Sequence, residues 1–401
     1  MNNRLRLFGC YLFLLATLAA CGGGSSDGGP SAAPPANTNN NSGGSGSAPP
    51  PNNSGSAPPP TTTSGLRIAY VAGNLGISAY SVNSDDGKLS EVAGSPFAPA
   101  TPFVPETRPT WVKVDPSNRF VYSTDGRGVH AYDIDHATGA LSEIAGSPFG
   151  TGGLGVILIH PTGQFVYAVD RGGGGVWAYR VAPTGALVQV AGAPFSAGSI
   201  PTDIAIDPSG KYAYVPDCLN SLVHAFQIDL ATGALTSPTD AFAETHPCGV
   251  AVDPSGKFAF AASSGGPRDG DQAGVWSFSI EPATGVLTQI GFVAAGLSPS
   301  RVAVHSSGQF AYAINFTSSD VSAFRIDAGG TLTSIGAAVP TGEQPGFITL
   351  DPSGRFAYVT SDRGTISGYR IDANTGALTE IEGSPLATTN LPASMTITGL
   401  L

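Results

Sequence analysis

A turn signature recurs six times between residues 66 and 401, each time followed by a short apolar segment. Its commonest form is Asp-Pro-Ser-Gly, then Lys or Arg, then aromatic residues separated by a small one. The six copies begin at Asp115, His160, Asp207, Asp253, His305 and Asp351, which are 45, 47, 46, 52 and 46 residues apart. A period of this length is typical of β-propeller blades, because leucine-rich repeats are shorter and helical repeats carry a helical pattern.

Each repeat is predicted to hold four short strands. In the clearest repeat they are residues 203–207, 211–215, 222–228 and 234–236. Large apolar side chains recur there at a spacing of two, as a strand requires, and no segment keeps a 3.6-residue period. Proline and glycine in Asp-Pro-Ser-Gly suit the first turn, and Thr-Gly suits the third. The pattern predicts an all-β chain with four-stranded antiparallel blades.

The third strand of the repeat occurs seven times, one more than the turn signature. Its copies are Ile77-Ser-Ala-Tyr, Val129-His-Ala-Tyr, Val176-Trp-Ala-Tyr, Val223-His-Ala-Phe, Val275-Trp-Ser-Phe, Val321-Ser-Ala-Phe and Ile366-Ser-Gly-Tyr. The first repeat begins at its second strand, residues 67–71, and the C-terminus supplies a spare first strand, residues 393–398. We therefore predict a seven-bladed β-propeller over residues 66–401, with one blade closed by both chain ends so that no open sheet edge remains.

Composition agrees with this fold and excludes one class of partner. The 401 residues include 54 Gly and 33 Pro, which disfavour a helix-rich protein. The 18 Lys and Arg against 29 Asp and Glu give a net charge of −11. Nucleic-acid binding is not expected, because it needs a clustered basic surface.

The N-terminus has the features of an export signal. Arg4 and Arg6 precede an apolar run over residues 7–18, whose twelve residues are too few to span a bilayer. The run ends in Leu18-Ala-Ala-Cys21, which resembles the bacterial lipobox, so residues 1–21 are predicted to be a lipoprotein signal in which Cys21 becomes acylated. Gly22, in place of an Asp, favours the outer membrane.

Residues 22–65 are rich in Gly, Ser, Pro and Asn, with Asp27 as the one charged residue. Such a segment cannot bury a core and is expected to act as a disordered tether, with a root-mean-square reach of roughly 35–40 Å. The predicted protein is thus exported and lipid-anchored in the bacterial envelope, with no transmembrane helix.

The repeat strings resemble the lactonase-like seven-bladed propellers, the family of 6-phosphogluconolactonase, carboxymuconate cyclase and YVTN-type relatives. The resemblance covers residues 66–401 and is carried by the Asp-Pro-Ser-Gly strings and by Tyr369-Arg-Ile-Asp-Ala-Asn-Thr-Gly-Ala-Leu. It implies opening of a cyclic ester by a base and cationic donors. The positions that match the family's histidines and glutamate read Pro201-Thr202, Ser300-Arg301 and Asn315-Phe316. The histidines and the glutamate are missing, so the fold does not settle the activity.

Candidate ligand-binding residues gather on the face opposite the Asp-Pro-Ser-Gly turns, where first strands begin and second strands end. They are Asp170, Arg171, Asp203, Asp217, His246 and Arg301, with Asp125, Arg127, Asp362 and Arg363 on the same face. Residues near the central axis could form a concave polar site. The alternative is that paired Asp and Arg side chains solvate the loops and bridge neighbouring blades. His160 and His305 replace the turn aspartate and are interpreted as turn variants, and Trp111, Trp177 and Trp276 as packing residues.

Two cysteines remain in the predicted propeller. Cys218 and Cys248 fall on this face in adjacent blades, and in an oxidising compartment they are expected to form a disulfide. No cofactor or metal site is predicted, because Asp269 and Asp271 alone fall short of the ligands that calcium requires.

Three functional hypotheses follow. The first is a monomeric scaffold that binds a small molecule or an envelope partner on the loop face. The second is a lactone hydrolase with a rebuilt site. The third is an envelope-assembly component that recognises protein strands through blade edges.

Overall fold

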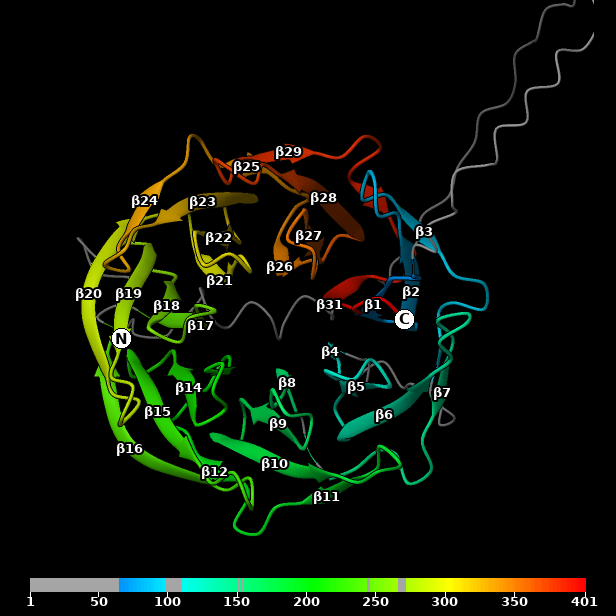
Figure 1. Ribbon diagram of the computed structural model, residues 1–401, viewed down its shortest axis with the longest axis horizontal. Coiled ribbons are helices and arrows are strands. Elements are labelled where there is room, and N and C mark those ends of the chain that lie inside the picture. The colour runs from blue at the N-terminus through cyan, green and yellow to red at the C-terminus, as the bar shows by residue number, and fades with distance from the viewer. Residues whose placement is uncertain (1–64, 99–109, 151, 153, 244–245, 266–271) are drawn as a thin grey trace, which may run out of the picture. The chain divides into compact units, whose positions relative to one another are not determined.

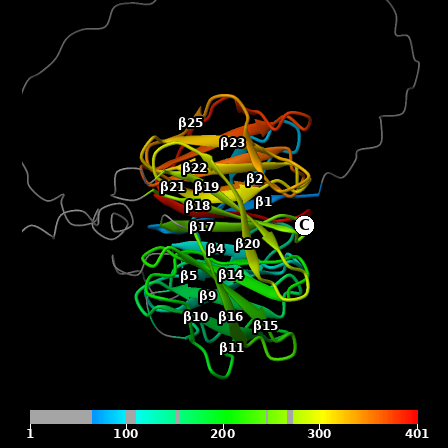
Figure 2. The ribbon, with the colours of Figure 1, turned by 90° about the vertical axis from the view of Figure 1, so that its left-hand side faces the viewer.

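The computed structural model describes residues 65–98, 110–150, 152, 154–243, 246–265 and 272–401. The predicted signal peptide, the acylated Cys21, the tether up to residue 64 and Asp269 with Asp271 lie outside these residues. The described residues form a ring of seven antiparallel sheets around a central axis (Figures 1 and 2), which confirms the predicted propeller. They include no helix that is long and apolar enough to cross a membrane.

The blades follow one another around the ring in chain order. From the innermost strand outward, blade 1 contains β31 (Pro392–Ile397), β1 (Ile68–Gly73), β2 (Gly76–Val82) and β3 (Leu89–Glu91). Blade 2 contains β4 (Trp111–Val114), β5 (Phe120–Thr124), β6 (Val129–Ile134) and β7 (Leu141–Glu143). Blade 3 contains β8 (Ile157–Ile159), β9 (Phe165–Asp170), β10 (Gly175–Val181) and β11 (Leu187–Gln189). Blade 4 contains β13 (Ala205–Ile206), β14 (Tyr212–Asp217), β15 (Leu222–Ile228) and β16 (Leu235–Phe242).

The last three blades keep this order. Blade 5 contains β17 (Pro247–Val252), β18 (Phe258–Ser263), β19 (Gly274–Ile280) and β20 (Leu287–Ala294). Blade 6 contains β21 (Pro299–Val304), β22 (Phe310–Asn315), β23 (Asp320–Ile326) and β24 (Leu332–Ser334). Blade 7 contains β26 (Pro345–Leu350), β27 (Phe356–Ser361), β28 (Thr365–Ile371) and β29 (Leu378–Glu380).

The outermost strand differs from the prediction in five blades, where it is split in two. Short segments β12 (Phe195–Ser196), β25 (Val339–Pro340) and β30 (Leu386–Ala387) pair with the third strands of blades 3, 6 and 7. Single bridges at Phe97 and Phe149 do the same in blades 1 and 2. In four of these blades the last residue of the break, immediately before the second segment, is a proline, which has no N–H to donate to the ladder.

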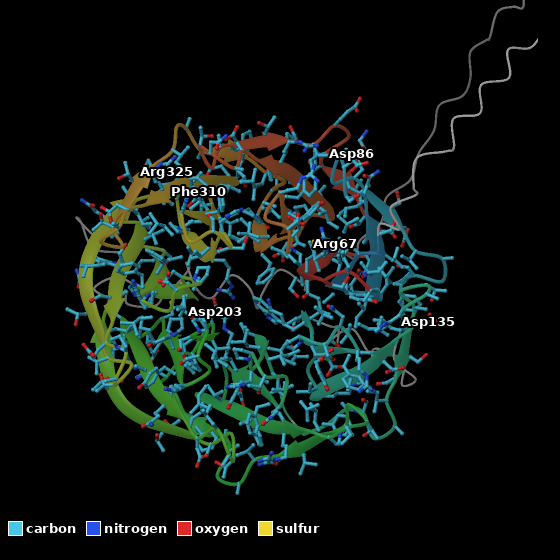
Figure 3. The ribbon with its side chains drawn as sticks, in the orientation of Figure 1. Arg67, Asp86, Asp135, Asp203, Phe310 and Arg325 are labelled. Carbon is cyan, nitrogen blue, oxygen red and sulfur yellow. The ribbon has the colours of Figure 1, made fainter. Side chains whose placement is uncertain are left out.

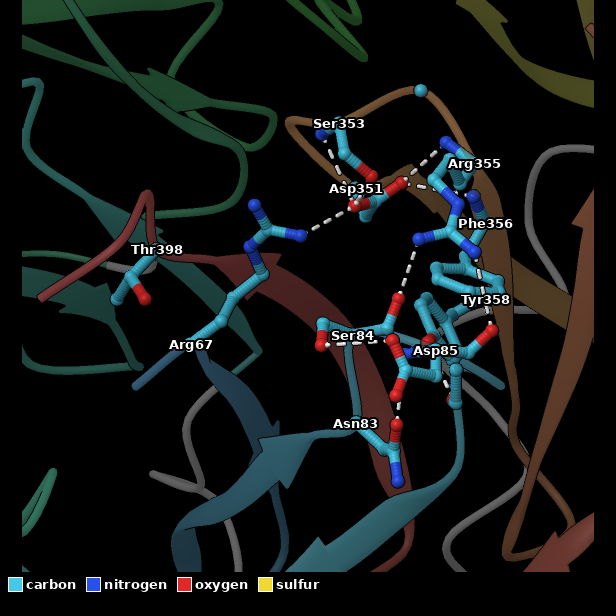
Figure 4. A network of polar contacts seen from close by, with 12 residues as sticks. Arg67, Asn83, Ser84, Asp85, Asp351, Ser353, Arg355, Phe356, Tyr358 and Thr398 are labelled. Atoms are coloured by element: carbon cyan, nitrogen blue, oxygen red, sulfur yellow. Dashed lines mark hydrogen bonds and ion pairs between the residues drawn. The ribbon is translucent and has the colours of Figure 1, made fainter. Parts of the chain in front are cut away.

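Both chain ends build blade 1, as predicted. β31 pairs antiparallel with β1, from Ala69 opposite Ile397 to Gly73 opposite Pro392. Figure 4 shows the seam with blade 7, where Arg67 Nη1 lies 2.9 Å from Asp351 Oδ2. The backbone N–H of Leu401 donates to the carbonyl of Leu66 at 2.8 Å, so both ends of the ring leave on one face.

The Asp-Pro-Ser-Gly turns occupy this same face, here called the turn face. In a typical turn, Asp207 Oδ1 accepts the N–H of Tyr212 at 2.7 Å and Oδ2 accepts that of Ser209 at 3.0 Å. His160 replaces the aspartate and forms a 2.9 Å hydrogen bond from Nε2 to the carbonyl of Gly210 in the next blade. His305 makes the equivalent contact with Gly354 at 2.7 Å. The interpretation of both histidines as turn variants is confirmed.

The core lies between neighbouring blades, and a tyrosine ladder crosses almost every blade interface. A second-strand tyrosine of one blade donates its hydroxyl to the carbonyl of a turn glycine in the next. The pairs are Tyr70 with Gly139, Tyr122 with Gly185, Tyr167 with Gly233, Tyr214 with Gly285, Tyr312 with Gly376 and Tyr358 with Gly87. Blade 5 has Phe260 at this position, so its interface with blade 6 lacks the hydrogen bond. The pair of Tyr358 and Gly87 closes the ring across the seam between blades 7 and 1.

Candidate functional site

The face opposite the turns is called the loop face, because first strands begin and second strands end there. The innermost strands run from this face into the ring and surround its axis. Figure 3 shows Asp203 near the centre of the ring, whereas Phe310 and Arg325 lie farther out. Side chains from opposite blades can therefore meet at the axis.

Arg301 reaches across several blades at this end of the axis. From β21 in blade 6, its Nη1 donates to the carbonyl of Cys248 in blade 5 at 2.7 Å. Its Nη2 donates to the carbonyl of Thr202 in blade 4 at 3.3 Å. On the far side, the guanidinium carbon lies 5.0 Å from the centroid of the Trp111 ring in blade 2. One cation thus connects four blades.

Asp203 is the buried carboxylate closest to this arginine. Its Oδ2 lies 3.9 Å from Arg301 Nε and accepts the N–H of Val250 at 3.1 Å, while Oδ1 accepts the N–H of Ile204 at 2.9 Å. Burial raises the pKa of the Asp203 carboxyl above its ordinary value, although Arg301 and these N–H groups oppose the change. The structure therefore brings two of the predicted residues together.

Two aromatic rings and a lysine complete the group. Trp111 meets Phe347 of blade 7 edge to face, with ring centroids 5.0 Å apart. Lys113, two residues farther along β4, places its Nζ 5.4 Å from the centroid of the Phe347 ring. Burial lowers the pKa of the Lys113 ammonium, and Asp203 partly offsets this. We call Trp111, Lys113, Asp203, Arg301 and Phe347 the axial cluster.

Arg171 adds a third cation near the axial cluster. Its Cγ and Cδ lie 3.7 Å from a Cβ built on Gly155, at the start of the inner strand of blade 3. Burial lowers the pKa of Arg171, and the positive charge of Arg301 lowers it further. Since arginine stays protonated in proteins, Arg171 remains charged at neutral pH.

Where the inner strands of blades 5 and 6 begin, three polar atoms are buried without a hydrogen-bond partner within the described part of the chain. They are Nε of Arg301, Oγ of Ser300 and Nδ1 of His246. Buried polar groups nearly always have partners, so such atoms at a charged site are expected to bind water or a ligand. His246 lies just before β17 and has a φ of 33°.

Two other predicted residues organise their own loops. Asp217 accepts N–H groups of Ser199 at 2.7 Å and Ile200 at 3.1 Å. Burial alone would raise the pKa of Asp217, but these bonds outweigh it and hold the pKa below its usual value. Asp170 accepts the N–H of Gly173 at 2.7 Å and ends β9. Backbone N–H groups of the loops donate to both carboxylates, and their ligand binding stays a prediction.

A buried ionic network lies in blade 2. His130 lies 3.0 Å from Asp125 Oδ2 through Nε2 and 2.7 Å from Glu143 Oε1 through Nδ1. Arg127 Nε contacts Asp125 at 3.2 Å. Burial opposes protonation of His130, but the two carboxylates outweigh it and raise its pKa. This network is structural rather than axial, because its hydrogen bonds join the second, third and fourth strands.

The remaining predicted positions are less closely tied to the axis. Oδ1 of Asp362 lies 3.2 Å from a Cβ built on Gly346, at the start of the inner strand of blade 7. Arg363 is exposed. Sulfur atoms of Cys218 and Cys248 lie 3.3 Å apart, a contact distance and not the roughly 2.05 Å of an S–S bond, so the disulfide stays a prediction.

The sequence predicts Asp203 and Arg301 of the axial cluster, and Arg171 near it, but not the other three members of the cluster. Trp111 was assigned to packing, and Lys113 and Phe347 were missed. The alternation of side chains along a strand could have identified Lys113, because residues two apart on an inner strand share a side.

Among the described residues, no group of three or more His, Cys, Asp or Glu side chains could hold a metal ion.

Comparisons with known proteins agree with this geometry. Residues 155–343 and 295–390 match the family model described as lactonase, 7-bladed beta-propeller. The chain belongs to the lactonase family of seven-bladed β-propellers. A search of curated proteins found no match.

Solved structures of this fold are similar to this chain over most of its length. A candidate 6-phosphogluconolactonase from Bacteroides fragilis is 21% identical with a TM-score of 0.70, over 85% of this chain and 100% of its own. The periplasmic gluconolactonase PpgL from Pseudomonas aeruginosa is 17% identical with a TM-score of 0.66, over 84% of this chain and 100% of its own. At these identities the likeness establishes the fold alone.

Proposed function

We propose that this lactonase-family propeller binds a small anionic, hydroxylated molecule, such as a sugar acid, at the axial cluster. The supporting observation is that Arg171, Arg301 and Lys113 converge near the axis of a protein whose net charge is −11. Arginine forks suit carboxylate and phosphate groups, and aromatic rings suit the apolar face of a sugar. The names of the similar structures refer to gluconolactones, whose ring opening gives such acids.

The protein is further proposed to be an exported monomer, anchored through acylated Cys21 to the bacterial envelope, with the outer membrane as its site. The lipobox-like Leu18–Cys21 segment supports the anchor. Since the described chain enters and leaves the ring on the turn face, a tether there would leave the loop face accessible. An envelope protein that docks on the loop face is the competing partner.

Lactone hydrolysis is a second candidate, favoured by family membership and by the Asp203–Arg301 pair. Asp203 has a raised pKa, which suits a general base that takes a proton from water. The resulting hydroxide would attack the lactone carbonyl, and Arg301 would stabilise the oxyanion. Cleavage of the ring C–O bond, with return of the proton from Asp203 to the leaving ring oxygen, would release the hydroxy acid. Thr202, Arg301 and Phe316 occupy the positions where the family resemblance implies histidines and a glutamate.

Calorimetry with gluconate and 6-phosphogluconate, together with pH-stat assays on the corresponding lactones, tests both candidates. Arg301→Ala should weaken acid binding at least about tenfold, because it removes charge-assisted hydrogen bonds. Arg325→Ala is the matched control, since Arg325 also stacks on an aromatic ring but lies outside the axial cluster. Equal binding by both variants would contradict the axial site. Turnover lost in Asp203→Asn would favour the hydrolase, and capture of an envelope protein without acid binding would favour the partner.

A further inference from the structure

A cavity of about 370 Å³ opens on the outer part of the ring at the seam between blades 7 and 1. Its apolar walls come from Leu89 of blade 1 and from Ile366, Ile381 and Leu386 of blade 7. Its volume falls within the range of about 300–1,000 Å³ for small-molecule pockets. The cavity is separate from the axial cluster, because none of its lining residues belongs to an innermost strand.

The repeats provide an internal comparison for this cavity. Gly368 occupies the third-strand position held by Ala or Ser in the other blades, at Ala79, Ala131, Ala178, Ala225, Ser277 and Ala323. A Cβ at Gly368 would lie 3.2 Å from Ile381 Cδ1 and 3.4 Å from Tyr358 Cε1, so the consensus methyl group would displace Ile381, a residue that lines the cavity. The glycine thus allows a position of Ile381 that the consensus residue would not.

The turn that covers the cavity also departs from the other blades. Lys88 follows the turn glycine, whereas the equivalent residues are Ala140, Ala186, Ala234, Val286, Thr331 and Ala377. Lys88 Nζ lies 3.0 Å from Glu382 Oε2 at the mouth of the cavity and 3.9 Å from Asp86 Oδ2. All three side chains are exposed, and an exposed ion pair contributes about 0–1 kcal/mol, so another carboxylate can replace Glu382 at little cost.

Two departures from the repeat therefore meet at one cavity: a glycine in place of alanine or serine in its wall, and a lysine at its mouth. We propose that the seam pocket binds a medium-chain aliphatic carboxylate, with the chain among Leu89, Ile366, Ile381 and Leu386 and the carboxylate on Lys88. The seam itself is held independently of a ligand, because Arg355 Nη1 donates to the carbonyl of Ser84 at 2.7 Å and Tyr358 to that of Gly87 at 2.6 Å (Figure 4). This site does not depend on the proposed function.

Calorimetry of the purified protein with decanoate below its micelle concentration tests the site, with decanol and butyrate as comparison ligands. Decanoate should bind saturably at one site per chain, and butyrate should bind far more weakly because it leaves the apolar wall uncovered. Gly368→Ala should weaken decanoate binding at least about tenfold, the effect of one misfitting methyl group in an apolar pocket. Lys88→Ala should weaken the binding of decanoate about two- to fivefold and leave the binding of decanol unchanged.

Both variants restore the residue found in other blades, so they are expected to fold, and thermal unfolding verifies this. Arg301→Ala should keep decanoate binding, which separates this site from the axial cluster. Cross-linking with a diazirine-bearing decanoate should label residues 87–89 and 366–386. Unchanged decanoate affinity in Gly368→Ala, labels elsewhere, or no saturable binding by the natural sequence would each overturn the proposal.

Discussion

Removal of residues 391–401 is expected to destabilise the ring far more than its length suggests. The segment contains β31, whose Met395 and Ile397 are 0% and 6% exposed. Burying each such side chain contributes about 1.5–3 kcal/mol. Hydroxyls of Ser394, Thr396 and Thr398 also accept backbone N–H groups of Val112, Val114 and Ile68, each worth about 0.5–1.5 kcal/mol.

Together these interactions amount to about 5–10 kcal/mol, a large part of the roughly 5–15 kcal/mol that stabilises a folded domain. The truncated chain should therefore be unfolded or melt far below the intact chain in calorimetry and circular dichroism. A milder variant, Met395→Ala, should cost about 2–5 kcal/mol through the cavity that it leaves. Leu400→Ala is its control, because Leu400 is 61% exposed. A truncated protein with an unchanged melting temperature would refute closure by β31.

The tyrosine ladder predicts opposite effects of two substitutions on the free energy of unfolding in urea. Tyr312→Phe should lower it by about 0.5–1.5 kcal/mol, and Phe260→Tyr should raise it by up to that amount, because the new hydroxyl completes the ladder at Gly330. A lower free energy of unfolding in both variants would refute the role of the ladder. Because the pKa of His130 is raised on folding, its stabilisation is fully present below pH of about 6.5 and is lost as pH rises through the folded pKa. The stability gap between the natural protein and His130→Gln should therefore narrow between pH 6 and pH 9 in urea titrations, and a gap that widens would contradict the ionic network. Peptide mapping without reductant should find Cys218 linked to Cys248, whereas two alkylatable thiols in protein from an oxidising compartment would exclude this disulfide.

The fold could be predicted because the residues that determine the strands and turns lie close together within each repeat. Alternating side chains set the strands, and the turn residues of Asp207–Gly210 satisfy their own backbone N–H groups within one hairpin. The closing strand was predictable by counting, since seven third strands and six turn signatures leave one first strand unassigned. The split outer strands were not predicted, because pairing of such short segments depends on the neighbouring third strand.

The axial cluster was only partly predictable, because it joins residues from blades 2, 4, 6 and 7. Arg301 and Asp203 were identified as charged residues at inner-strand starts. Trp111 packs against Phe347, in agreement with the packing interpretation. Its contact with a charged side chain becomes evident only in the structure, where Arg301 reaches it from across the axis. The carboxylate of Asp217 was predicted to bind a ligand. Its charge and its position in the sequence do not reveal that backbone N–H groups of Ser199 and Ile200 donate to it.

The central proposal, an anion site at the axial cluster, is tested most directly by a crystal structure of the protein grown with gluconate. We predict ligand density at the loop-face end of the axis, with the carboxylate on Arg301 or Arg171 and the carbon chain against Trp111 or Phe347. Gluconate bound only at other sites, with the axial side chains unchanged and in contact with solvent alone, would contradict the proposal.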